Sequence, residues 1–356
     1  MVSTVTSVLD AEDLRARVNK LLDAFIERQR PILCAISDDL DIVVSAAAAI
    51  LQGGKRLRPA FAYWGWRGAG AADCESIVAA VTSLELLQAC ALIHDDVMDG
   101  SATRRGQPSV HKRFARIHQQ SSWLGSADGF GEGAAILMGD LALTWADELL
   151  FQSGLPDASL LRAKPTYDRM RTELMAGQYL DLLEQARGGG SVERAMRVAR
   201  YKAAKYTVEG PLQLGGILAG ASSSVLDSYS AYGLPLGEAF QLRDDLLGVF
   251  GDPAVTGKPA GDDLREGKRT VLIALAHQHA TPEQRSLLQR HLGDPNLTSD
   301  GVDELREVLV TTGAYDHVER LIGTLAEQAS QALRNIDEPA ESVLAELALA
   351  ATTRHG

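Results

Sequence analysis

The sequence predicts an all-α fold, and three observations support this prediction. The chain is 46% hydrophobic and rich in Ala and Leu, whereas aromatic residues make up only 5% of it. Apolar residues recur at the i, i+3, i+4 and i+7 spacing of one helix face. No segment alternates apolar and polar residues in the way that a half-buried strand does. With 356 residues, the chain is long enough to bury a substantial core.

The clearest helical patterns are expected, in chain order, over 77–93, 134–151, 168–183 and 229–250. No linker is long enough to divide the chain, so we expect a single domain over 1–356.

Three segments interrupt the helical pattern. Residues 118–133 are rich in Ser and Gly and are expected to form a surface loop between helices. Residues 186–195 contain three consecutive glycines followed by Ser191, a plausible helix N-cap. Residues 251–270 mix Gly, Pro, Lys and Asp, and this segment is too charged to be only a connector.

Composition excludes several classes of function. The net charge of −12, from 35 basic and 47 acidic residues, argues against a nucleic-acid partner. The N-terminus shows no signal-peptide pattern, and the apolar run at 42–51 is shorter than the roughly 20 residues of a membrane span. Cys34, Cys74 and Cys90 lack the spacing of a metal site or a disulfide framework. We therefore expect a cytoplasmic protein without a transmembrane segment.

The first candidate site is the stretch "LIHDDVMDG" at 92–100, where Asp95, Asp96 and Asp99 end an apolar run. Three carboxylates this close repel one another and resist burial, so another group must offset their charge. A solvated helix end, a calcium loop and a magnesium site for an anionic substrate are the three interpretations. On a helix, Asp95 and Asp99 share one face, and Gln88 lies on that face two turns earlier.

A second acidic motif, "QLRDDLLGVFGD" at 241–252, also lies at the polar end of an apolar helical stretch and contains Asp244 and Asp245. Gly251 and the proline at 253 are expected to end this helix before Asp252. The ligand pattern of an EF-hand is missing, and His94 has no second His or Cys at zinc-ligand spacing. Two such motifs favour Mg²⁺, which is usually shared with substrate phosphates. The similar run "SDDLDI" at 37–42 has no basic cluster beside it and is interpreted as a solvated face.

Basic residues lie close to both acidic motifs. The stretch "GGKRLRP" at 53–59 presents several cations after two glycines, and "RRG" follows the first motif by a few residues. Neighbouring cations can bind a polyphosphate, and glycine lets the backbone approach it closely. Charges of both signs suit a metal–diphosphate complex better than either ion alone. The basic residues concerned are Lys55, Arg56, Arg58, Arg104, Arg105, Lys202, Lys205, Lys258 and Lys268.

Together with "GQYLDL" at 177–182 and the segment 240–270, these motifs resemble the trans-isoprenyl diphosphate synthases, also called polyprenyl synthetases. The resemblance extends from about residue 30 to 340 and is greatest to the geranylgeranyl diphosphate synthases. It implies the isoprenoid synthase fold, a single bundle of antiparallel helices around a central cavity, usually in a homodimer. It also implies a prenyltransferase that condenses isopentenyl diphosphate with an allylic diphosphate, head to tail from C1' to C4.

The resemblance implies three Mg²⁺ ions per active site, with a role for each matching residue. Asp95 and Asp99 would bind two of these ions and Asp244 the third, with Asp96 and Asp245 as supporting carboxylates. The residues that would hold isopentenyl diphosphate are Lys55, Arg58, Gln88 and Arg105. Those that would hold the allylic diphosphate are Arg104, Lys202, Gln241, Lys258 and Lys268. Gln178 and Asp181 would line the cavity.

This chain departs from the family pattern at three positions. The second motif has Gly248 where many members have a third aspartate, although Asp252 could contribute through water. Ala203 follows Lys202 where a hydroxyl residue is common, and Gln88 stands where many relatives have His. These departures put the affinity for the allylic substrate in question, but they leave the first motif whole.

The resemblance also implies that residues just before the first motif set product length. Cys90 and Ala91, five and four residues before Asp95, are small, and Leu87 and Leu84 lie deeper along the same helix. This pattern predicts geranylgeranyl diphosphate, C20. Farnesyl and C25–C30 products stay open, and so does the reading that these residues are small only to let helices pack.

A class I terpene cyclase and a regulatory synthase subunit are the two alternative functional classes. A class I terpene cyclase would need a different second metal motif and more aromatic residues to guide cations. A regulatory synthase subunit would be expected to lose acidic ligands or the arginines of "GGKRLRP".

Overall fold

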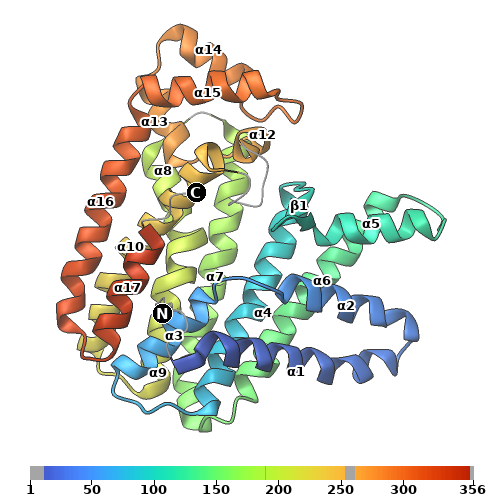
Figure 1. Cartoon of the computed structure of the whole chain (residues 1–356), viewed down its shortest axis with the longest axis vertical. Helices are drawn as coiled ribbons and strands as arrows, with labels where there is room; N and C mark the ends of the chain where they lie inside the picture. The colour runs from blue at the N-terminus through green and yellow to red at the C-terminus, as the bar shows by residue number, and fades with distance from the viewer. Residues whose placement is uncertain (1–11, 189, 253–260, 353–356) are drawn as a thin grey trace, which may run out of the picture.

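The computed structural model describes residues 12–188, 190–252 and 261–352, and these residues are almost entirely helical (Figure 1). The first half of the chain forms α1 (Leu14–Cys34), α2 (Asp41–Leu51), α3 (Leu57–Gly68), α4 (Glu75–Met98), α5 (Val110–Gln120), α6 (Ala127–Phe151) and α7 (Asp157–Arg187). The middle forms α8 (Val192–Val198), a π-helix (Ala199–Glu209), α9 (Gly210–Ala219) and α10 (Ser223–Phe250). The last part forms α12 (Asp262–Glu266), α13 (Val271–His279), α14 (Pro282–His291), α15 (Ser299–Thr311), α16 (Ala314–Ala332) and α17 (Ala340–Thr352).

The all-α prediction is confirmed, with one small addition. Two strands of two residues each, β1 (Thr103–Arg104) and β2 (Gln107–Pro108), pair antiparallel directly after α4. Gly106 turns the chain between them with φ of +72°. This pair of strands lies just beyond the first acidic motif.

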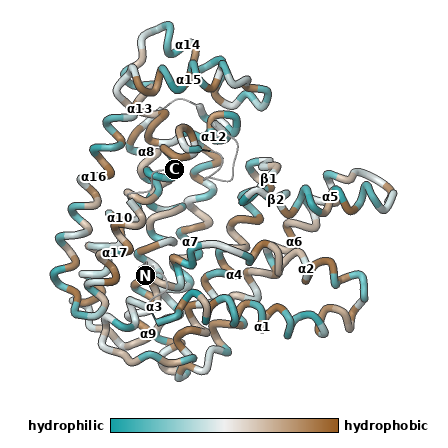
Figure 2. Tube along the Cα trace, in the orientation of Figure 1, coloured by the Kyte–Doolittle hydropathy of each residue, from teal (hydrophilic) through white to brown (hydrophobic). Residues whose placement is uncertain are grey.

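The long helices pack side by side around two apolar clusters. α4 packs against α6, and α10 packs against both the π-helix and α16. The larger cluster contains Tyr232 and Leu236 of α10, whereas the second contains Leu242 and Leu246 from the same helix together with residues of α12 to α16. Figure 2 shows alternating hydrophobic and hydrophilic stretches along α1 and α16, as expected for helices with one buried face. α10 therefore contributes residues to both clusters. The single domain over 1–356 stays a prediction.

Each of the four long helical patterns lies inside an observed helix. The pattern at 77–93 falls within α4 and that at 229–250 falls within α10. α4 is long and apolar enough by composition to cross a membrane, but 72% of its most apolar window is buried inside the protein. A buried core helix meets the same criterion, so this observation gives little support to a membrane span.

The loop expected at 118–133 is much shorter in the structure. α5 continues to Gln120 and α6 begins at Ala127, which leaves 121–126 between them. Ser126 caps α6 by accepting a hydrogen bond from the backbone N–H of Gly129. The prediction gave too much weight to the glycines, because a well-capped and packed helix tolerates them.

The other two interruptions agree better with expectation. Ser191 caps α8 and accepts from the N–H of Arg194, as predicted. α10 ends at Phe250 before Asp252, also as predicted. The charged segment after it contains α12, whereas residues 253–260, including Lys258, lie outside the described residues.

Candidate active site

A cavity of about 940 Å³ opens among α4, α7, the π-helix, α10 and α12. It brings together residues that lie far apart in the sequence. The predicted site residues on its wall are Lys55, Arg58, Gln88, Asp95, Arg104, Arg105, Gln178, Asp181, Lys202, Gln241, Asp244, Asp245 and Lys268. Both acidic motifs therefore contribute residues to one cavity.

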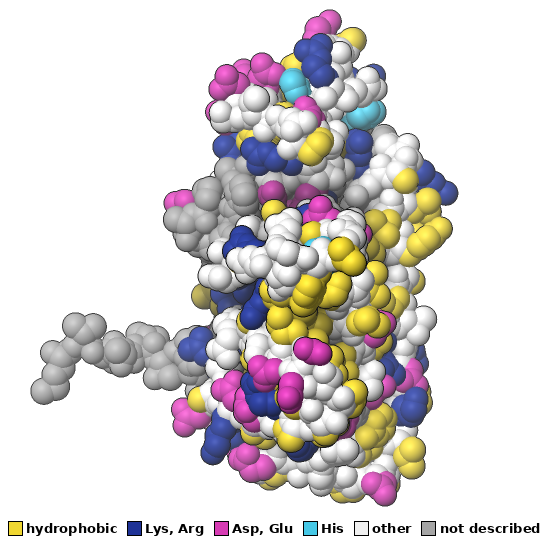
Figure 3. Space-filling model, turned by 90° about the vertical axis from the view of Figure 1, so that its right-hand side faces the viewer, with side chains coloured by type: hydrophobic (Ala, Val, Ile, Leu, Met, Phe, Trp, Pro, Cys, Tyr) yellow, Lys and Arg dark blue, Asp and Glu magenta, His cyan; other side chains and the backbone are white. Residues whose placement is uncertain are grey.

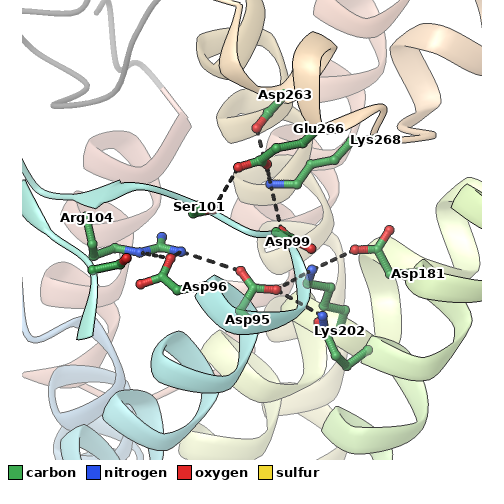
Figure 4. Close-up of polar contacts among 12 residues, drawn as sticks. Asp95, Asp96, Asp99, Ser101, Arg104, Asp181, Lys202, Asp263, Glu266 and Lys268 are labelled. Carbon is green, nitrogen blue, oxygen red and sulfur yellow. Dashed lines mark hydrogen bonds and ion pairs between the residues drawn. The ribbon is translucent and has the colours of Figure 1, made fainter. Parts of the chain in front are cut away.

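The first acidic motif lies at the C-terminal end of α4, where Asp99 is the C-cap residue. Asp95 Oδ1 accepts hydrogen bonds from Lys202 Nζ and Gln178 Nε2, each at 3.0 Å. Asp96 is 1% exposed and pairs with Arg104, whose Nη2 also lies 3.6 Å from Asp95 Oδ2 (Figure 4). Asp96 therefore orients Arg104 beside Asp95.

Asp99 lies behind the cavity wall with a side chain only 2% exposed. Its two carboxylate oxygens are buried and accept no hydrogen bond from the residues that the structure describes, and Lys268 Nζ lies 3.5 Å from Oδ2. A buried carboxylate without hydrogen-bond donors is costly. Its oxygens are thus available to a ligand of opposite charge.

In the second motif, Gln241 and Asp245 are one turn apart on α10. Gln241 Nε2 donates to Asp245 Oδ1 at 2.7 Å, so Gln241, predicted to hold the allylic diphosphate, orients a carboxylate in this structure. Asp244 and Asp245 both line the cavity. Asp252 follows the end of α10 and is not among the residues that line the cavity.

Three carboxyl groups of the two motifs have displaced pKa values, one of them lowered and two of them raised. Burial tends to raise the pKa of Asp95, but Lys202, Lys268 and Arg104 outweigh it and lower that pKa to about 2. Burial, and then the charge of Asp95, raises the pKa of Asp99 to about 6. Burial also raises the pKa of Asp245 to about 7. Two of the carboxyls therefore titrate near neutral pH.

Lys202 and Lys268 place ammonium groups between carboxylates from different helices. Lys202 Nζ lies 2.7 Å from Asp181 Oδ2 on α7 as well as 3.0 Å from Asp95. Its helical segment has π-helix geometry, a rare form that is frequently found at functional sites. Lys205, one turn later, pairs instead with Glu173 and does not line the cavity.

The three basic residues of the stretch at 53–59 all line the cavity, and one of them is also held in a buried ion pair. Arg56 is 6% exposed, and its guanidinium donates to Glu85 at 2.5 Å and to the carbonyl oxygen of Leu51. Arg56 therefore anchors the loop, and both Arg56 and Lys55 lie on the cavity wall.

Arg58, which follows on α3, contacts the π-helix directly. It donates to Thr207 at 2.7 Å and lies over the Tyr206 ring at 4.4 Å, while its buried Nε has no hydrogen-bond partner within the described part of the chain. Tyr206 in turn donates to Gln88 Oε1 at 2.9 Å. The predicted residues Gln88 and Arg58 are thus joined through a tyrosine that sequence reasoning had not selected.

Of the three residues predicted to set product length, only Ala91 lies on the cavity wall. Cys90 is fully buried with its Sγ 3.8 Å from Nδ1 of His94, and Leu87 is also fully buried. These two therefore lie behind the wall, and their role in chain length stays a prediction.

The donor set suits a hard cation that is shared with a substrate. Its ligands are all carboxylate oxygens, the type that Mg²⁺ prefers, and among the described residues none donates a hydrogen bond to the two oxygens of Asp99. Within the described ranges, no three His, Cys, Asp or Glu side chains converge closely enough to hold a metal ion by themselves. Mg²⁺ often binds through one or two carboxylates and completes its shell with water and phosphate oxygens. The residues present therefore fit Mg²⁺ brought together with a diphosphate.

Sequence reasoning also missed Asp263 and Glu266, which come from α12. Glu266 accepts a hydrogen bond from Ser101 at 2.8 Å, and both carboxylates lie within 3.2 Å of Lys268 Nζ. The signal was present in the acidic pair of "GDDLREGK", directly before a lysine that had been selected.

Comparisons with known proteins agree with this geometry. The family profile described as Polyprenyl synthetase matches residues 41–309. The crystal structure of geranylgeranyl pyrophosphate synthase from Corynebacterium glutamicum, complexed with isoprenyl diphosphate and magnesium, is 41% identical with a TM-score of 0.93. The match covers 96% of this chain and 98% of that one.

Two further relatives are named for other product lengths. A geranylfarnesyl diphosphate synthase of Aeropyrum pernix is 31% identical over 81% of this chain and 85% of its own length. A (2E,6E)-farnesyl diphosphate synthase of Mycobacterium tuberculosis is 33% identical over 72% of this chain and 66% of its own length. The relatives thus share a family while differing in the product for which they are named.

Proposed function

The chain belongs to the polyprenyl synthetase family of prenyltransferases, and we propose that it condenses isopentenyl diphosphate with an allylic diphosphate to make geranylgeranyl diphosphate. The observation that carries this proposal is the meeting of two acidic motifs and several cations around one cavity. Such a site can bind two diphosphates only if metal ions offset the negative charge of both carboxylates and substrates.

In the proposed reaction, the C–O bond of the allylic diphosphate breaks and diphosphate leaves with the electron pair. The double bond of isopentenyl diphosphate then attacks the allylic carbon, and a proton lost from the new product passes to the released diphosphate. Mg²⁺, when bound, supplies electrostatic stabilisation of the charge that develops on the leaving group. We assign no general base to the protein.

The protein side chains would bind, orient and exclude water. Asp95, Asp99 and Asp244 would hold Mg²⁺, three ions per site being our proposal. Lys202 and Lys268 would hold the allylic diphosphate, and the apolar parts of the wall would keep water from the allylic cation. Supporting observations are the 3.0 Å contact of Lys202 with Asp95 and the buried oxygens of Asp99, which accept no hydrogen bond from any described residue.

The remaining substrate contacts follow from the basic residues of the wall. Lys55, Arg58, Gln88 and Arg105 would hold isopentenyl diphosphate, and the buried Nε of Arg58 is a donor with no partner among the residues that the structure describes. Arg104 would reach the allylic diphosphate from its position between Asp95 and Asp96. Gln241 would act mainly by orienting Asp245.

The C20 product is proposed from residues of this chain, because the relatives are named for farnesyl, geranylgeranyl and geranylfarnesyl products. Ala91 leaves space on the wall one turn from Asp95. Fully buried Leu87 and Leu84 would limit the chain after a few isoprene units.

We also propose a cytoplasmic homodimer. Figure 3 shows hydrophobic side chains gathered on one face of the molecule, the side that carries α5 and α6 in Figure 1. On α6, Leu137 is 70% exposed and Ile136 46% exposed. Exposed apolar surface of this kind commonly marks a protein–protein interface. Sedimentation equilibrium of the purified protein tests the dimer.

Release of inorganic diphosphate distinguishes the proposed reaction from its competitors. We expect release from geranyl diphosphate only when isopentenyl diphosphate and Mg²⁺ are both present, and none after chelation of the metal. Release without isopentenyl diphosphate would indicate a cyclase or a hydrolase. No release with any allylic primer would indicate a regulatory subunit and contradict the proposal.

A further inference from the structure

The π-helix that carries Lys202 packs closely against two long helices. It spans Ala199–Glu209 and contacts both α7 and α10. Its Lys202 ammonium group lies between Asp95 and Asp181 (Figure 4), so the depth at which the π-helix lies decides how far this group reaches into the cavity. Glycines on α7 and α10 form the contacts that determine this depth.

Gly177 of α7 forms the contact on the first side. A Cβ atom on Gly177 would lie 2.3 Å from the backbone nitrogen of Lys202 and 2.6 Å from the carbonyl carbon of Tyr201. Both are backbone atoms, which cannot rotate away as the end of a side chain can. Ordinary van der Waals contact begins at 3.4 Å, so a methyl group at this position would push the two helices apart by about 1 Å. Gly177 therefore lets the backbone of Lys202 lie directly against α7.

Two glycines of α10 form the contacts on the other side. A Cβ on Gly237 would lie 2.6 Å from the Cα of Ala204, and one on Gly233 would lie 2.8 Å from the Cα of Glu209. These contacts also involve backbone atoms. Lys202 and Ala204 are two positions apart, which is about half a turn of a helix. The π-helix is therefore held from nearly opposite sides by α7 and α10.

The spacing of the contacts with α10 matches a π-helix. Gly233 and Gly237 are four positions apart, whereas their partners Glu209 and Ala204 are five positions apart. The hydrogen bonds of a π-helix join residues five apart, so such residues share a face, as residues four apart do on an α-helix. On an α-helix, positions five apart point in different directions. The two glycines therefore fit this segment in its π-helical form.

The contact at Gly177 lies beside the donors that converge on Asp95. Asp95 Oδ1 accepts from Gln178 Nε2 on α7 and from Lys202 Nζ on the π-helix, each at 3.0 Å. Lys202 Nζ also lies 2.7 Å from Asp181, which is one turn after Gly177 on α7. A separation of about 1 Å between the two helices would draw the ammonium group away from these carboxylates or force its side chain out of its rotamer.

We propose that Gly177 and Gly237 are positioning residues, which hold the π-helix at the depth where Lys202 meets Asp95 and so place the allylic diphosphate. The inference rests on the proposed function, since it concerns the substrate that Lys202 is proposed to hold. If the glycines served packing alone, their substitution would lower stability without a selective effect on the allylic substrate.

Calorimetric titration of the full chain with geranyl diphosphate and Mg²⁺, and separately with isopentenyl diphosphate, tests the inference. We expect Gly177→Ala to raise the Kd for geranyl diphosphate by about 10-fold, the effect of losing a charged hydrogen bond. The Kd for isopentenyl diphosphate should stay within about twofold of the wild type. Gly323→Ala is the matched control, because Gly323 is an exposed glycine of α16 whose Cβ would meet no described atom within 4 Å. Both of its Kd values should equal those of the wild type.

A comparison of double variants separates positioning from packing. In Lys202→Met the ammonium group is absent, so Gly177 has nothing left to position. In that background, Gly177→Ala should change the Kd for geranyl diphosphate by less than about twofold. An effect of equal size with and without the Lys202 ammonium group would be merely structural and would overturn the inference.

The second glycine provides the test if Gly177→Ala does not fold, which thermal unfolding of each variant determines. Gly237→Ala displaces the same π-helix from the α10 side. Its Kd for geranyl diphosphate should rise as well, with the same dependence on Lys202. Loss of folding in both alanine variants would show that the glycines serve stability, and it would overturn the positioning role.

The outcomes separate the inference from the proposed function. A wild-type Kd for geranyl diphosphate in folded Gly177→Ala would overturn the role of Gly177 and leave the proposed function intact. A wild-type protein that binds geranyl diphosphate but condenses no isopentenyl diphosphate would overturn the proposed function alone. A wild-type protein that binds no geranyl diphosphate in the presence of Mg²⁺ would overturn both.

Discussion

Lys268 Nζ lies 3.5 Å from Asp99 Oδ2, so a lysine from the segment after α12 reaches the first acidic motif, 169 positions earlier in the sequence. The same ammonium group lies 3.2 Å from Asp263 and 2.7 Å from Glu266 (Figure 4). Lys202 forms a parallel link between Asp95 and Asp181. The two lysines keep strongly acidic helix ends close together across the cavity, which is the condition for a metal–diphosphate site.

Removing the carboxylate of Asp95 should abolish turnover. Asp95→Ala is expected to lower kcat by at least about 100-fold, since electrostatic groups at developing charge contribute on the order of 10²–10³. Incorporation of labelled isopentenyl diphosphate measures the loss, and circular dichroism verifies the fold. Asp38→Ala, from the exposed acidic run at 37–42, should retain full activity. Near wild-type turnover in Asp95→Ala would contradict the metal-site assignment.

Removing the ammonium group of Lys202 should weaken the binding of the allylic substrate. Lys202→Met leaves Asp95 and Asp181 without their shared cation and deletes one diphosphate contact. We expect KM for the allylic diphosphate to rise by about 10-fold or more, since charged hydrogen bonds contribute about 1.5–3 kcal/mol. Lys205→Met, whose lysine pairs with Glu173 outside the cavity, is the matched control. Equal KM values in the two variants would refute the assignment of Lys202.

The raised pKa values predict a pH dependence of metal binding. Asp99 and Asp245 have pKa values of about 6 and 7, and metal binding requires the ionised forms. Mg²⁺ affinity in the presence of diphosphate should therefore rise between about pH 5.5 and pH 8, with release of protons. Calorimetric titration in buffers of different ionisation enthalpy measures this release. Asp99→Asn should release fewer protons, and an unchanged number would contradict the role of Asp99.

Asp99 and Asp245 also predict that the stability of the metal-free protein falls with rising pH, whereas Mg²⁺ affinity rises. Their folded-state pKa values lie above the ordinary value of 3.8, so the folded state retains protons that the unfolded chain has lost. The contribution of these two groups to the free energy of unfolding should therefore fall as pH rises from about 4 to about 7. Urea unfolding of the wild type and of Asp245→Asn isolates it. A variant with the same pH slope as the wild type would contradict the prediction.

The buried pair of Arg56 and Glu85 predicts a change in stability. Arg56→Met leaves Glu85 buried without its cation, which should cost about 3–5 kcal/mol of unfolding free energy. Arg56→Met/Glu85→Leu should recover most of this loss, because it removes the uncompensated charge. Urea unfolding compares the three proteins. Equal stability of the wild type and Arg56→Met would show that the pair is not structurally important.

Ala91 and Cys90 predict where product length is set. Ala91→Phe fills the cavity wall and should shift the main product from C20 towards C15. Cys90→Phe should shorten the product as well if the growing chain enters the space behind the wall, where Cys90 is fully buried. Chromatography of the dephosphorylated products measures both shifts. An unchanged length distribution in Ala91→Phe would overturn the chain-length proposal.

Sequence reasoning predicted the parts of this protein that depend on local spacing. The long helices, the face shared by Asp95 and Asp99 and the end of α10 all follow from periodicity, capping and Gly–Pro signals. It failed where tertiary packing decided the outcome. α6 begins earlier than its glycines suggested because Ser126 caps it and the helix packs against α4.

The contacts of Arg58 and Asp263 could not be predicted for the same reason. Arg58 meets Thr207 from a helix 149 positions away in the sequence. Asp263 fills the space at Gly248 only because α12 packs back against α10. Spacing within one helix contains no information about a carboxylate that arrives from another helix, so the contact of Asp263 with Gly248 could not be predicted from the motif.

The most direct test of the proposed chemistry is the product formed from labelled isopentenyl diphosphate, Mg²⁺ and each of the C5, C10 and C15 allylic diphosphates. The account predicts Mg²⁺-dependent condensation with a dominant C20 product. A shorter or longer dominant product would contradict the chain-length proposal but preserve the reaction. Failure to condense any of the three primers would contradict the central claim that this cavity is the active site of a prenyl diphosphate synthase.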